Sequence, residues 1–166
     1  MFHDYLDSPI GPLLLVADEG GLTYVGLPKR GAVQAAPEGS QQAPAKLRAA
    51  RHQFEEYFAG TRYAFDLPLH PHGTPFQLEV WGALLAIEYG ATTSYAAVAQ
   101  RIGRPNAVRA VGAANGANPL SIVVPCHRVI GSDGDLTGYG GGLPAKRWLL
   151  AHERTHAPRA ILVLEP

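Results

Sequence analysis

A proline- and histidine-rich stretch, residues 68–73, divides the chain into two parts whose apolar residues follow different patterns. The first part holds three short β-like apolar runs separated by glycine and proline, at 2–5, 13–17 and 22–27. In the second part, apolar residues recur at the spacing of helices. This change of period predicts an α/β (α+β) chain of two domains. We expect a small N-terminal antiparallel-sheet α/β domain, residues 1–72, packed on a helix-turn-helix (winged-helix-like) domain, residues 73–166.

The first part contains one helix signal. Apolar residues at helical spacing predict a helix over about 44–59, with Gly60 as its C-terminal cap. Residues 31–45 are mostly Ala, Gln, Pro, Gly and Ser, and predict a surface loop. The run 63–67 predicts a return of the chain to the sheet.

The second part opens with a strong helix start signal. Thr74 is followed by proline and, three residues on, by Gln77, which is the pattern of a capping box. The helices expected from here on span 74–90, 94–102, 105–116 and 144–153. The second and third of these form the predicted helix-turn-helix. A β-like run at 122–124 precedes Cys126, and residues 131–142 predict a glycine-rich loop.

Composition excludes several classes of protein. Of 166 residues, 46% are hydrophobic and 17% are charged, which suits a packed core and does not suit disorder. The single cysteine excludes an internal disulfide framework and a cysteine-rich structural zinc site. No apolar run reaches the roughly 18 residues of a membrane span, and no signal-peptide pattern is present. We therefore expect a soluble, cytoplasmic protein that does not bind membranes.

Charge is balanced overall but unevenly distributed. Residues 1–90 hold six Lys/Arg and ten Asp/Glu (6 − 10 = −4), and residues 91–166 hold eight and four (8 − 4 = +4). Between Glu88 and Asp133 the charged residues are all arginines, namely Arg101, Arg104, Arg109 and Arg128. A stretch of one sign is typical of an anion-binding face, and equally of a sparsely charged buried segment. Charge alone leaves both interpretations open.

Cys126 is followed directly by His127 and Arg128. A lone cysteine is more often an inert buried hydrophobe than a nucleophile. A histidine and an arginine favour the thiolate if their charge or hydrogen bonds reach the sulfur, and a thiolate beside a base is an arrangement for covalent catalysis. The pair by itself does not decide between these two roles.

The expected helix over 106–116 is rich in alanine and glycine. Such a helix packs closely inside a protein, but it is also thin enough to enter a DNA minor groove, which is only about 6 Å wide. In the second case Arg109 is the long side chain that would reach into the base stack. These residues leave both roles open.

Five consecutive residues, Pro125-Cys126-His127-Arg128-Val129, stand among shorter motifs in a definite order. The shorter motifs are Ser94-Tyr95, Arg109-Ala110-Val111-Gly112, Asn118-Pro119, Gly138-Tyr139 and Leu149-Leu150-Ala151-His152-Glu153. In order and spacing they resemble the O6-alkylguanine-DNA alkyltransferase family (methylated-DNA–protein-cysteine methyltransferases). The resemblance is close over about 74–154, whereas the N-terminal part matches in general character only.

The resemblance implies DNA repair by an irreversible, single-turnover reaction. Cys126 would take the alkyl group from O6-alkylguanine, and from O4-alkylthymine, in one displacement and keep it as a thioether. His127 would accept the thiol proton through a water molecule, and Glu153 would orient His127. Tyr95 would hydrogen-bond N3 of the flipped guanine. The resemblance implies no cofactor.

It also implies the contacts that hold the base and the DNA. The carbonyls of Cys126 and Val129 would accept from the guanine amino group, and the Gly140 N–H, beside Tyr139, would donate to O6. Arg109 would fill the gap left by the flipped nucleotide, and Asn118 would brace the helix-turn-helix against the active-site segment. The DNA-binding residues implied are Arg109, Tyr95, Arg104, Ser132, Ala107 and Asn115.

Two departures from the family pattern carry expectations. Glycines at 140–142 stand where many members have a hydroxylic or bulky residue after the tyrosine, so we expect tolerance of alkyl groups larger than methyl. Some relatives hold a structural zinc partly through N-terminal cysteines, which this chain lacks. Its histidines at 3, 52, 70 and 72 make a poor tetrahedral set by themselves, so we expect no metal.

Other functions remain as alternatives to alkyl transfer. A non-catalytic lesion-binding protein would be expected to have lost the nucleophile, whereas this chain has Cys126 together with His127 and Glu153. A Cys–His hydrolase would need an oxyanion site, for which the sequence has no specific signal. The expected partner is double-stranded DNA containing O6-alkylguanine, bound by a monomer that needs no other protein.

Overall fold

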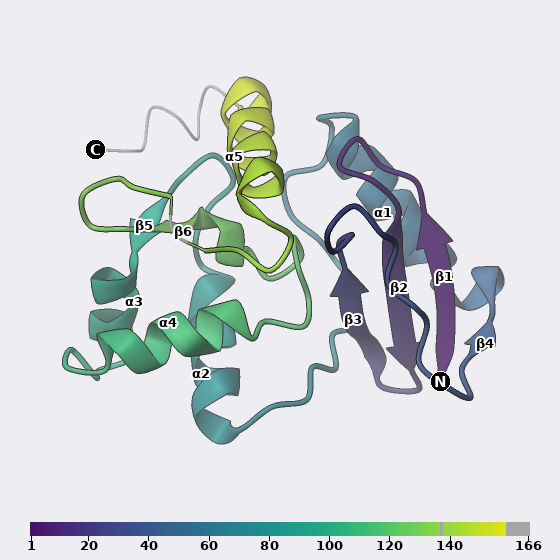
Figure 1. Ribbon diagram of the computed structural model, residues 1–166, viewed down its shortest axis with the longest axis horizontal. Coiled ribbons are helices and arrows are strands. Elements are labelled where there is room, and N and C mark those ends of the chain that lie inside the picture. The colour runs from purple at the N-terminus through teal and green to yellow at the C-terminus, as the bar shows by residue number, and fades with distance from the viewer. Residues whose placement is uncertain (137, 159–166) are drawn as a thin grey trace. The chain divides into compact units, whose positions relative to one another are not determined.

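The computed structural model describes residues 1–136 and 138–158 (Figure 1). The chain forms two compact units: unit 1 is Met1–His72 with Pro119–Ser121, and unit 2 is Gly73–Asn118 with the described residues from Ile122 onward. The short segment Pro119–Ser121 belongs to unit 1, because Val25 N–H donates to Pro119 O (2.8 Å). Sequence patterns did not predict this exchange. In the described ranges no helix is long and apolar enough to cross a membrane.

Unit 1 is built on a four-stranded sheet in the order β3-β2-β1-β4. The strands are β1 (Phe2–Leu6), β2 (Leu13–Asp18), β3 (Gly21–Gly26) and β4 (Gln41–Gln42). The pairs β1–β2 and β2–β3 are antiparallel, as expected, but β4 pairs parallel with β1. Residues 31–45 were expected to form a surface loop, and the structure differs in that this stretch contains the two-residue strand β4, which is exposed. The physical reason is that β4 hydrogen-bonds with the otherwise open edge of β1.

The core of unit 1 lies around β2, whose first five residues are all buried. A short 3₁₀ turn, η1 (Pro44–Leu47), leads into α1 (Arg48–Phe58), which contributes Phe54 and Tyr57 to this core. The run 63–67 does not form the predicted strand. Instead its Phe65 ring packs against Phe54, with the ring centroids 4.8 Å apart and the planes tilted by 51°, so side-chain packing holds this run in place. The chain meets the sheet only at Leu69, which bridges to Leu22.

The described residues of unit 2 form four α-helices and a two-stranded pairing. The elements are α2 (Pro75–Leu84), β5 (Thr93–Ser94), α3 (Tyr95–Arg101), α4 (Val108–Gly116), the 3₁₀ turn η2 (Cys126–Arg128), β6 (Val129–Ile130) and α5 (Leu143–His156). The helices α3 and α4 form the predicted helix-turn-helix, and both pack on α2. Trp81 Nε1–H donates to the carbonyl of Ala114 (2.8 Å), which ties α2 to α4. The α/β class is confirmed.

Two helix ends and one predicted strand in unit 2 differ from the sequence expectation. Helix α2 ends at Leu84 rather than near Gly90, because Ile87 N–H turns back to Leu84 O in a tighter i→i+3 bond. Helix α4 begins at Val108 rather than at Pro105, since Ala107 is its N-cap. The apolar run 122–124 is buried but is not a strand, because Ile122 has a φ of +74° and turns the chain sharply.

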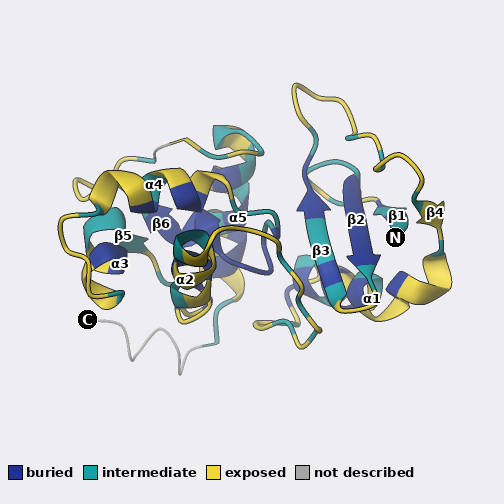
Figure 2. Ribbon diagram, turned by 90° about the horizontal axis from the view of Figure 1, so that it is seen from below, coloured by how far each residue is buried: buried dark blue, intermediate teal, exposed yellow. Residues whose placement is uncertain are grey.

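Side-chain caps mark where α2 and α3 begin. The Thr74 side chain accepts from Gln77 N–H (3.1 Å) and the Gln77 side chain accepts from Thr74 N–H (2.9 Å), so the capping box is complete. Ser94 caps α3 by accepting from Ala97 N–H (3.1 Å). Helix α4 has no such cap; it has both buried and exposed residues along its length (Figure 2).

We predict that Thr74→Ala lowers the free energy of unfolding of unit 2 by about 1 kcal/mol, the usual loss for an N-cap. Urea denaturation followed by tryptophan fluorescence reports on this unit, because Trp81 and Trp148 both lie in it. The matched control is Thr92→Ala, a change at an exposed threonine outside the capping box. Equal stabilities of the two variants would show that the capping box does not stabilise α2.

Candidate active site

Cys126 lies on the short turn η2, between the buried run 122–124 and β6. Its N–H donates to Val124 O (2.8 Å), and Arg128 N–H donates to Pro125 O (3.0 Å), so the turn is closed on both sides of the thiol. Cys126 is only 4% exposed. A reagent in bulk solvent can therefore reach this thiol only through a restricted approach.

His127 and Glu153 form a buried pair between η2 and α5. His127 Nε2 lies 2.7 Å from Glu153 Oε2, and both side chains are within 1% of complete burial. Because the carboxylate is ionised and can only accept, Nε2 carries the hydrogen and donates it. The remaining ring nitrogen, Nδ1, is then the acceptor of a neutral imidazole.

Arg128 completes the binding of the same carboxylate. Its Nε donates to Glu153 Oε1 (2.7 Å) and its Nη2 donates to Oε2 (3.0 Å), which makes a bidentate pair. Its Nη1 donates to the carbonyl of Ile87 (2.6 Å). Burial raises the pKa of Glu153, but the charges and hydrogen bonds of His127 and Arg128 together outweigh it and hold the pKa far below its ordinary value. Glu153 is therefore an anion throughout the physiological range.

His127 is prepared to act as a base. Burial is the main cause that lowers the pKa of His127, and it outweighs the opposing effect of Glu153. The imidazole is thus neutral at rest. Its Nδ1 is buried and has no hydrogen-bond partner among residues 1–136 and 138–158. A buried acceptor of this kind can take a proton without first giving up another bond.

The thiol of Cys126 is protonated at rest. Burial raises the pKa of Cys126 to about 11, and a hydrogen bond from Asn118 and the nearby charge of Lys146 offset only part of that rise. The condition under which His127 and Arg128 would favour a resting thiolate is not met, because Arg128 is bound to Glu153 and His127 is neutral. Any nucleophilic reaction of Cys126 therefore needs removal of its proton at the time of reaction.

Lys146 is a buried cation that sequence patterns did not single out. The side chain is fully buried, and its Nζ donates to the carbonyl of Val129 (2.8 Å). Burial is the main cause that lowers the pKa of Lys146, against the opposing effect of Cys126. A possible signal was available, since Lys146 stands seven residues before Glu153 and so shares its face of α5.

Two asparagines connect the helix-turn-helix to the segment that carries Cys126. Asn118 Nδ2 donates to Val124 O (2.8 Å), and Asn115 Nδ2 lies 3.4 Å from Cys126 O. Asn115 is buried at the end of α4. It was expected to contact DNA, but it lies inside unit 2 against the backbone of the cysteine. The bracing role expected for Asn118 agrees with this geometry.

Tyr95 reaches the same region through a strand pairing. β5 pairs parallel with β6, with Thr93 opposite Val129 and Ser94 opposite Ile130. Tyr95 follows β5 directly, so its backbone stands beside the segment that continues from the cysteine. On its other side the ring approaches Gly112, where an added Cβ would lie 3.9 Å from it.

The remaining residues expected to bind DNA or substrate lie toward the surface of unit 2. Arg109 is exposed on the first turn of α4, and Ala107 is its half-buried N-cap. Arg104 is exposed but pairs with Glu79 (3.2 Å), an interaction between exposed groups that a stronger anion could displace. The loop residues are Ser132 and Gly140, both exposed, and Tyr139, which is half-buried.

Near Cys126 the described residues include no convergent set of three metal-ligating side chains. The arrangement has the parts of a nucleophile that is activated by a base: a buried thiol, a neutral imidazole with a free nitrogen, and an ionised carboxylate that orients the imidazole. These parts suit a reaction in which a group is transferred to the cysteine itself.

Comparisons with known proteins agree over both units. The DNA-binding domain of 6-O-methylguanine DNA methyltransferase matches residues 75–155, and the ribonuclease-like domain of the same family matches residues 1–71. A methylated-DNA–protein-cysteine methyltransferase of Methanosarcina acetivorans is 48% identical over 153 residues, which cover 92% of this chain and 98% of that protein. One of Mycobacterium tuberculosis is 46% identical over 160 residues, covering 96% of each chain. The crystal structure of Mycobacterium tuberculosis OGT in complex with DNA matches with a TM-score of 0.88 at 45% identity, covering 99% of this chain and 100% of that one.

We predict that acid destabilises unit 2 in two steps. The unfolded His127 takes up a proton near its ordinary pKa of 6.5, which the folded, buried ring resists, so the free energy of unfolding falls as the pH drops below 6.5. Glu153 has a lowered folded pKa, so its stabilising contribution is full above the ordinary value of 4.5 and is lost as the pH falls below it.

Urea denaturation at pH values from 8 down to about 2.5 measures both steps. The variant His127→Gln should remove the first step and keep the second. The exposed His52 on α1 provides the control, His52→Gln, which should keep both. If the first step persists in His127→Gln, it arises from another titrating group.

Proposed function

The chain belongs to the 6-O-methylguanine DNA methyltransferase family, and on this basis we infer that it repairs DNA by transferring an alkyl group from the damaged base to Cys126. It is a methylated-DNA–protein-cysteine methyltransferase and binds DNA. The observation that carries the assignment of residues is the buried series of thiol, neutral imidazole and ionised carboxylate, with His127 Nδ1 free to accept a proton. The steps and residue roles that follow are proposals built on that observation.

The reaction is one displacement at the alkyl carbon of O6-alkylguanine. The Cys126 thiol gives its proton to His127 Nδ1 through one water molecule as Sγ attacks. The C–S bond forms, the bond between the alkyl carbon and O6 breaks, and the electron pair of that bond goes to the guanine. The product is a thioether on the protein, and the guanine is restored when it takes up a proton.

Each buried charged group would stabilise a charge that forms during this displacement. Glu153 stabilises the imidazolium that forms on His127, and Arg128 keeps Glu153 ionised and aligned. Lys146 lies close enough to affect the thiol electrostatically and would stabilise the negative charge that develops on sulfur. Tyr95 would donate a hydrogen bond to N3 of guanine as the ring acquires charge.

The reaction consumes the protein because the thioether that forms on Cys126 is a poor electrophile and keeps the alkyl group. Each molecule therefore acts once. The quantity to measure is therefore the number of alkyl groups transferred per protein molecule, not a turnover rate.

Burial of Cys126 is the argument for nucleotide flipping. A thiol that is 4% exposed cannot reach an alkyl group stacked inside a duplex. The damaged nucleotide must leave the stack, which costs a few kcal/mol, and a side chain that fills the gap lowers that cost. Arg109 is the exposed arginine on the first turn of α4 and would fill the gap from the minor groove. We propose that the protein acts on duplex DNA in this way as a monomer.

The first experiment is the intact mass of the protein after mixing with a duplex that contains one O6-methylguanine. We expect one added methyl group per protein, mapped to Cys126 and absent from Cys126→Ser. An unchanged mass with the duplex still bound would mean that the chain binds lesions without repairing them. An unchanged mass without binding would contradict the proposed function altogether.

We predict that Arg109→Ala slows repair of duplex DNA at least about tenfold, the scale of losing a few kcal/mol of support for the flipped state. Transfer from the free base O6-benzylguanine, which needs no flipping, should stay within about twofold of the wild-type rate. Single-turnover kinetics on both substrates measure this difference. The control Arg48→Ala removes one charge from an exposed arginine of α1. Equal losses on both substrates would exclude a role in flipping.

We predict that the glycine-rich loop admits large alkyl groups. An added Cβ at Gly138 or at Gly140 would meet nothing within 4 Å, so this wall is open in the described loop residues. The rate should fall less than about tenfold from O6-methylguanine to O6-benzylguanine in the same duplex, and Gly140→Trp should slow the benzyl substrate more than the methyl one. A steep loss from methyl to benzyl in the wild-type protein would contradict this expectation.

A further inference from the structure

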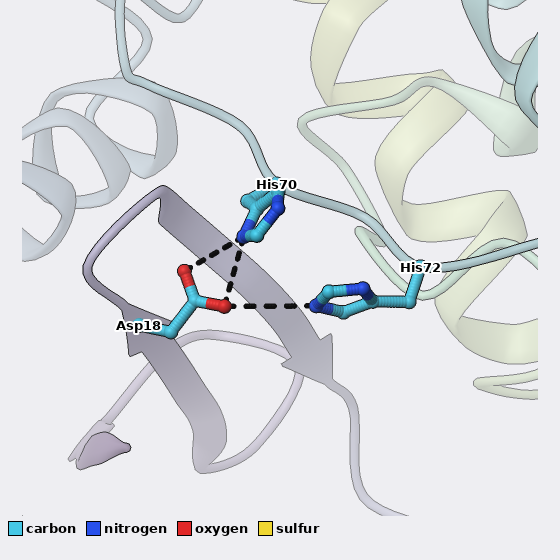
Figure 3. A group of neighbouring side chains, drawn as sticks. All are labelled: Asp18, His70 and His72. Carbon is cyan, nitrogen blue, oxygen red and sulfur yellow. Dashed lines mark hydrogen bonds and ion pairs between the residues drawn. The ribbon is translucent and has the colours of Figure 1, made fainter.

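A group of metal-ligating side chains lies in unit 1, apart from the residues assigned to alkyl transfer. Asp18, at the end of β2, faces both His70 and His72 (Figure 3). His70 Nδ1 is 2.8 Å from both carboxylate oxygens, and His72 Nε2 is 3.6 Å from Oδ2. One ligand atom from each residue lies within 4.8 Å of the other two. Both imidazoles therefore present a nitrogen to one carboxylate.

These separations are close to those of a zinc site. Zinc binds imidazole nitrogen at about 2.0–2.1 Å and carboxylate oxygen at about 2.0–2.2 Å in tetrahedral geometry, so neighbouring ligand atoms lie about 3.3–3.5 Å apart. The distance from His72 to Asp18 is already near this value. The distance from His70 to Asp18 would have to lengthen by roughly half an ångström, which a side-chain rotation supplies.

The backbone holds the three residues in this arrangement. Leu22 N–H donates to Pro68 O (2.9 Å) and His70 N–H donates to Leu22 O (2.8 Å), which fixes the segment before His72 against the start of β3. Two residues apart in an extended segment, His70 and His72 can face the same side. The carboxylate of Asp18 is oriented by Gly20 N–H (2.8 Å).

Gly20 also makes room for the first imidazole. A Cβ at this position would lie 2.6 Å from His70 Nδ1, so any other residue would displace the ring from Asp18. The two imidazole rings themselves are 4.6 Å apart and inclined at 61°, which lets each direct a nitrogen at the carboxylate without stacking. The arrangement is thus specific to this backbone and to a glycine at its centre.

We propose that Asp18, His70 and His72 bind a zinc ion, with water in the remaining position. Two imidazole nitrogens and one carboxylate oxygen are a donor set that suits zinc better than calcium or magnesium, which prefer oxygen ligands alone. The expectation of no metal considered the histidines without Asp18, which stands 52 residues from His70 in the chain. The donor set also contains no cysteine, so it differs from the cysteine-containing zinc site expected of some relatives.

Bound zinc would act as a cross-link within unit 1. It would join the β2–β3 turn to the segment that ends the unit at His72. Because the ion would bind the folded state alone, its binding free energy would add to the stability of that state. The ion would therefore stabilise the sheet and fix the position of the segment that leads out of it.

The test is calorimetric titration of metal-free full-length protein with zinc chloride at pH 7.5, followed by a thermal melt. We expect one ion per chain, and a rise in Tm of about 5 °C at a zinc concentration about 100 times the dissociation constant. His70→Ala and Asp18→Asn should each weaken binding about tenfold or more. His52→Ala is the matched control, because His52 is exposed and faces only one carboxylate, Glu56 (3.6 Å). It should bind zinc as the wild type does.

Cobalt(II) substitution locates the ion. Four-coordinate cobalt with nitrogen and oxygen ligands gives visible absorption bands without the near-ultraviolet band of a thiolate ligand. A thiolate band would place the metal on Cys126 and overturn the proposal, as would saturable binding that survives in both His70→Ala and Asp18→Asn. Absence of stoichiometric binding in the wild type would show that Asp18, His70 and His72 form an ion-pair network only.

Alkyl transfer is measured separately on the same variants. His70→Ala should still accept one methyl group at Cys126, since none of the three residues contributes to the proposed reaction. If His70→Ala loses zinc binding but still accepts the methyl group, the result supports the metal site and leaves the proposed repair function unaffected. Failure of methyl transfer in the wild type would overturn the repair function and leave the zinc titration valid.

Discussion

The buried carboxylate of Glu153 is the group on which the active-site region depends. It binds His127 at 2.7 Å and Arg128 through two further hydrogen bonds, and so connects α5 to the turn that carries Cys126. A charge this deeply buried is tolerable only when it is paired and fully hydrogen-bonded. Removal of Glu153 would leave Arg128 as an uncompensated buried cation and would release the imidazole. The hydrogen bonds of Glu153 therefore serve both the stability of this region and the proposed chemistry.

The environment of Cys126 keeps its thiol protonated, because burial raises the pKa of the thiol to about 11. In the proposed reaction, the neutral His127 would remove the proton and Lys146 would stabilise the charge once a substrate is bound. A protein that is consumed by one reaction benefits from a nucleophile activated in this way, because a spurious alkylation would destroy it.

Part of this organisation could be predicted from the sequence because it is local. The capping box at Thr74, the cap at Ser94 and the helix-turn-helix depend on residues three or four apart, and the structure has them where they were expected. The run from Pro125 to Val129 is local as well, and together with the shorter motifs it carried the resemblance that implied the chemistry. Predicted elements were wrong where contacts between residues far apart in the sequence determine the structure. The run 63–67 lies against aromatic side chains rather than in the sheet, and β4 forms only because β1 offers it an open edge.

The sequence by itself therefore determined the class of fold, the nucleophile and its neighbouring histidine, and the family. The family resemblance had already linked Glu153 to His127, whereas only the tertiary structure showed which groups join Lys146 and Asp18. Lys146 stands 17 residues from Val129, and Asp18 stands 52 residues from His70. Whether such pairs meet, and whether burial raises or lowers the pKa of each group, depends on how helices and strands pack together. No local pattern encodes desolvation, because it is a property of everything that surrounds a residue.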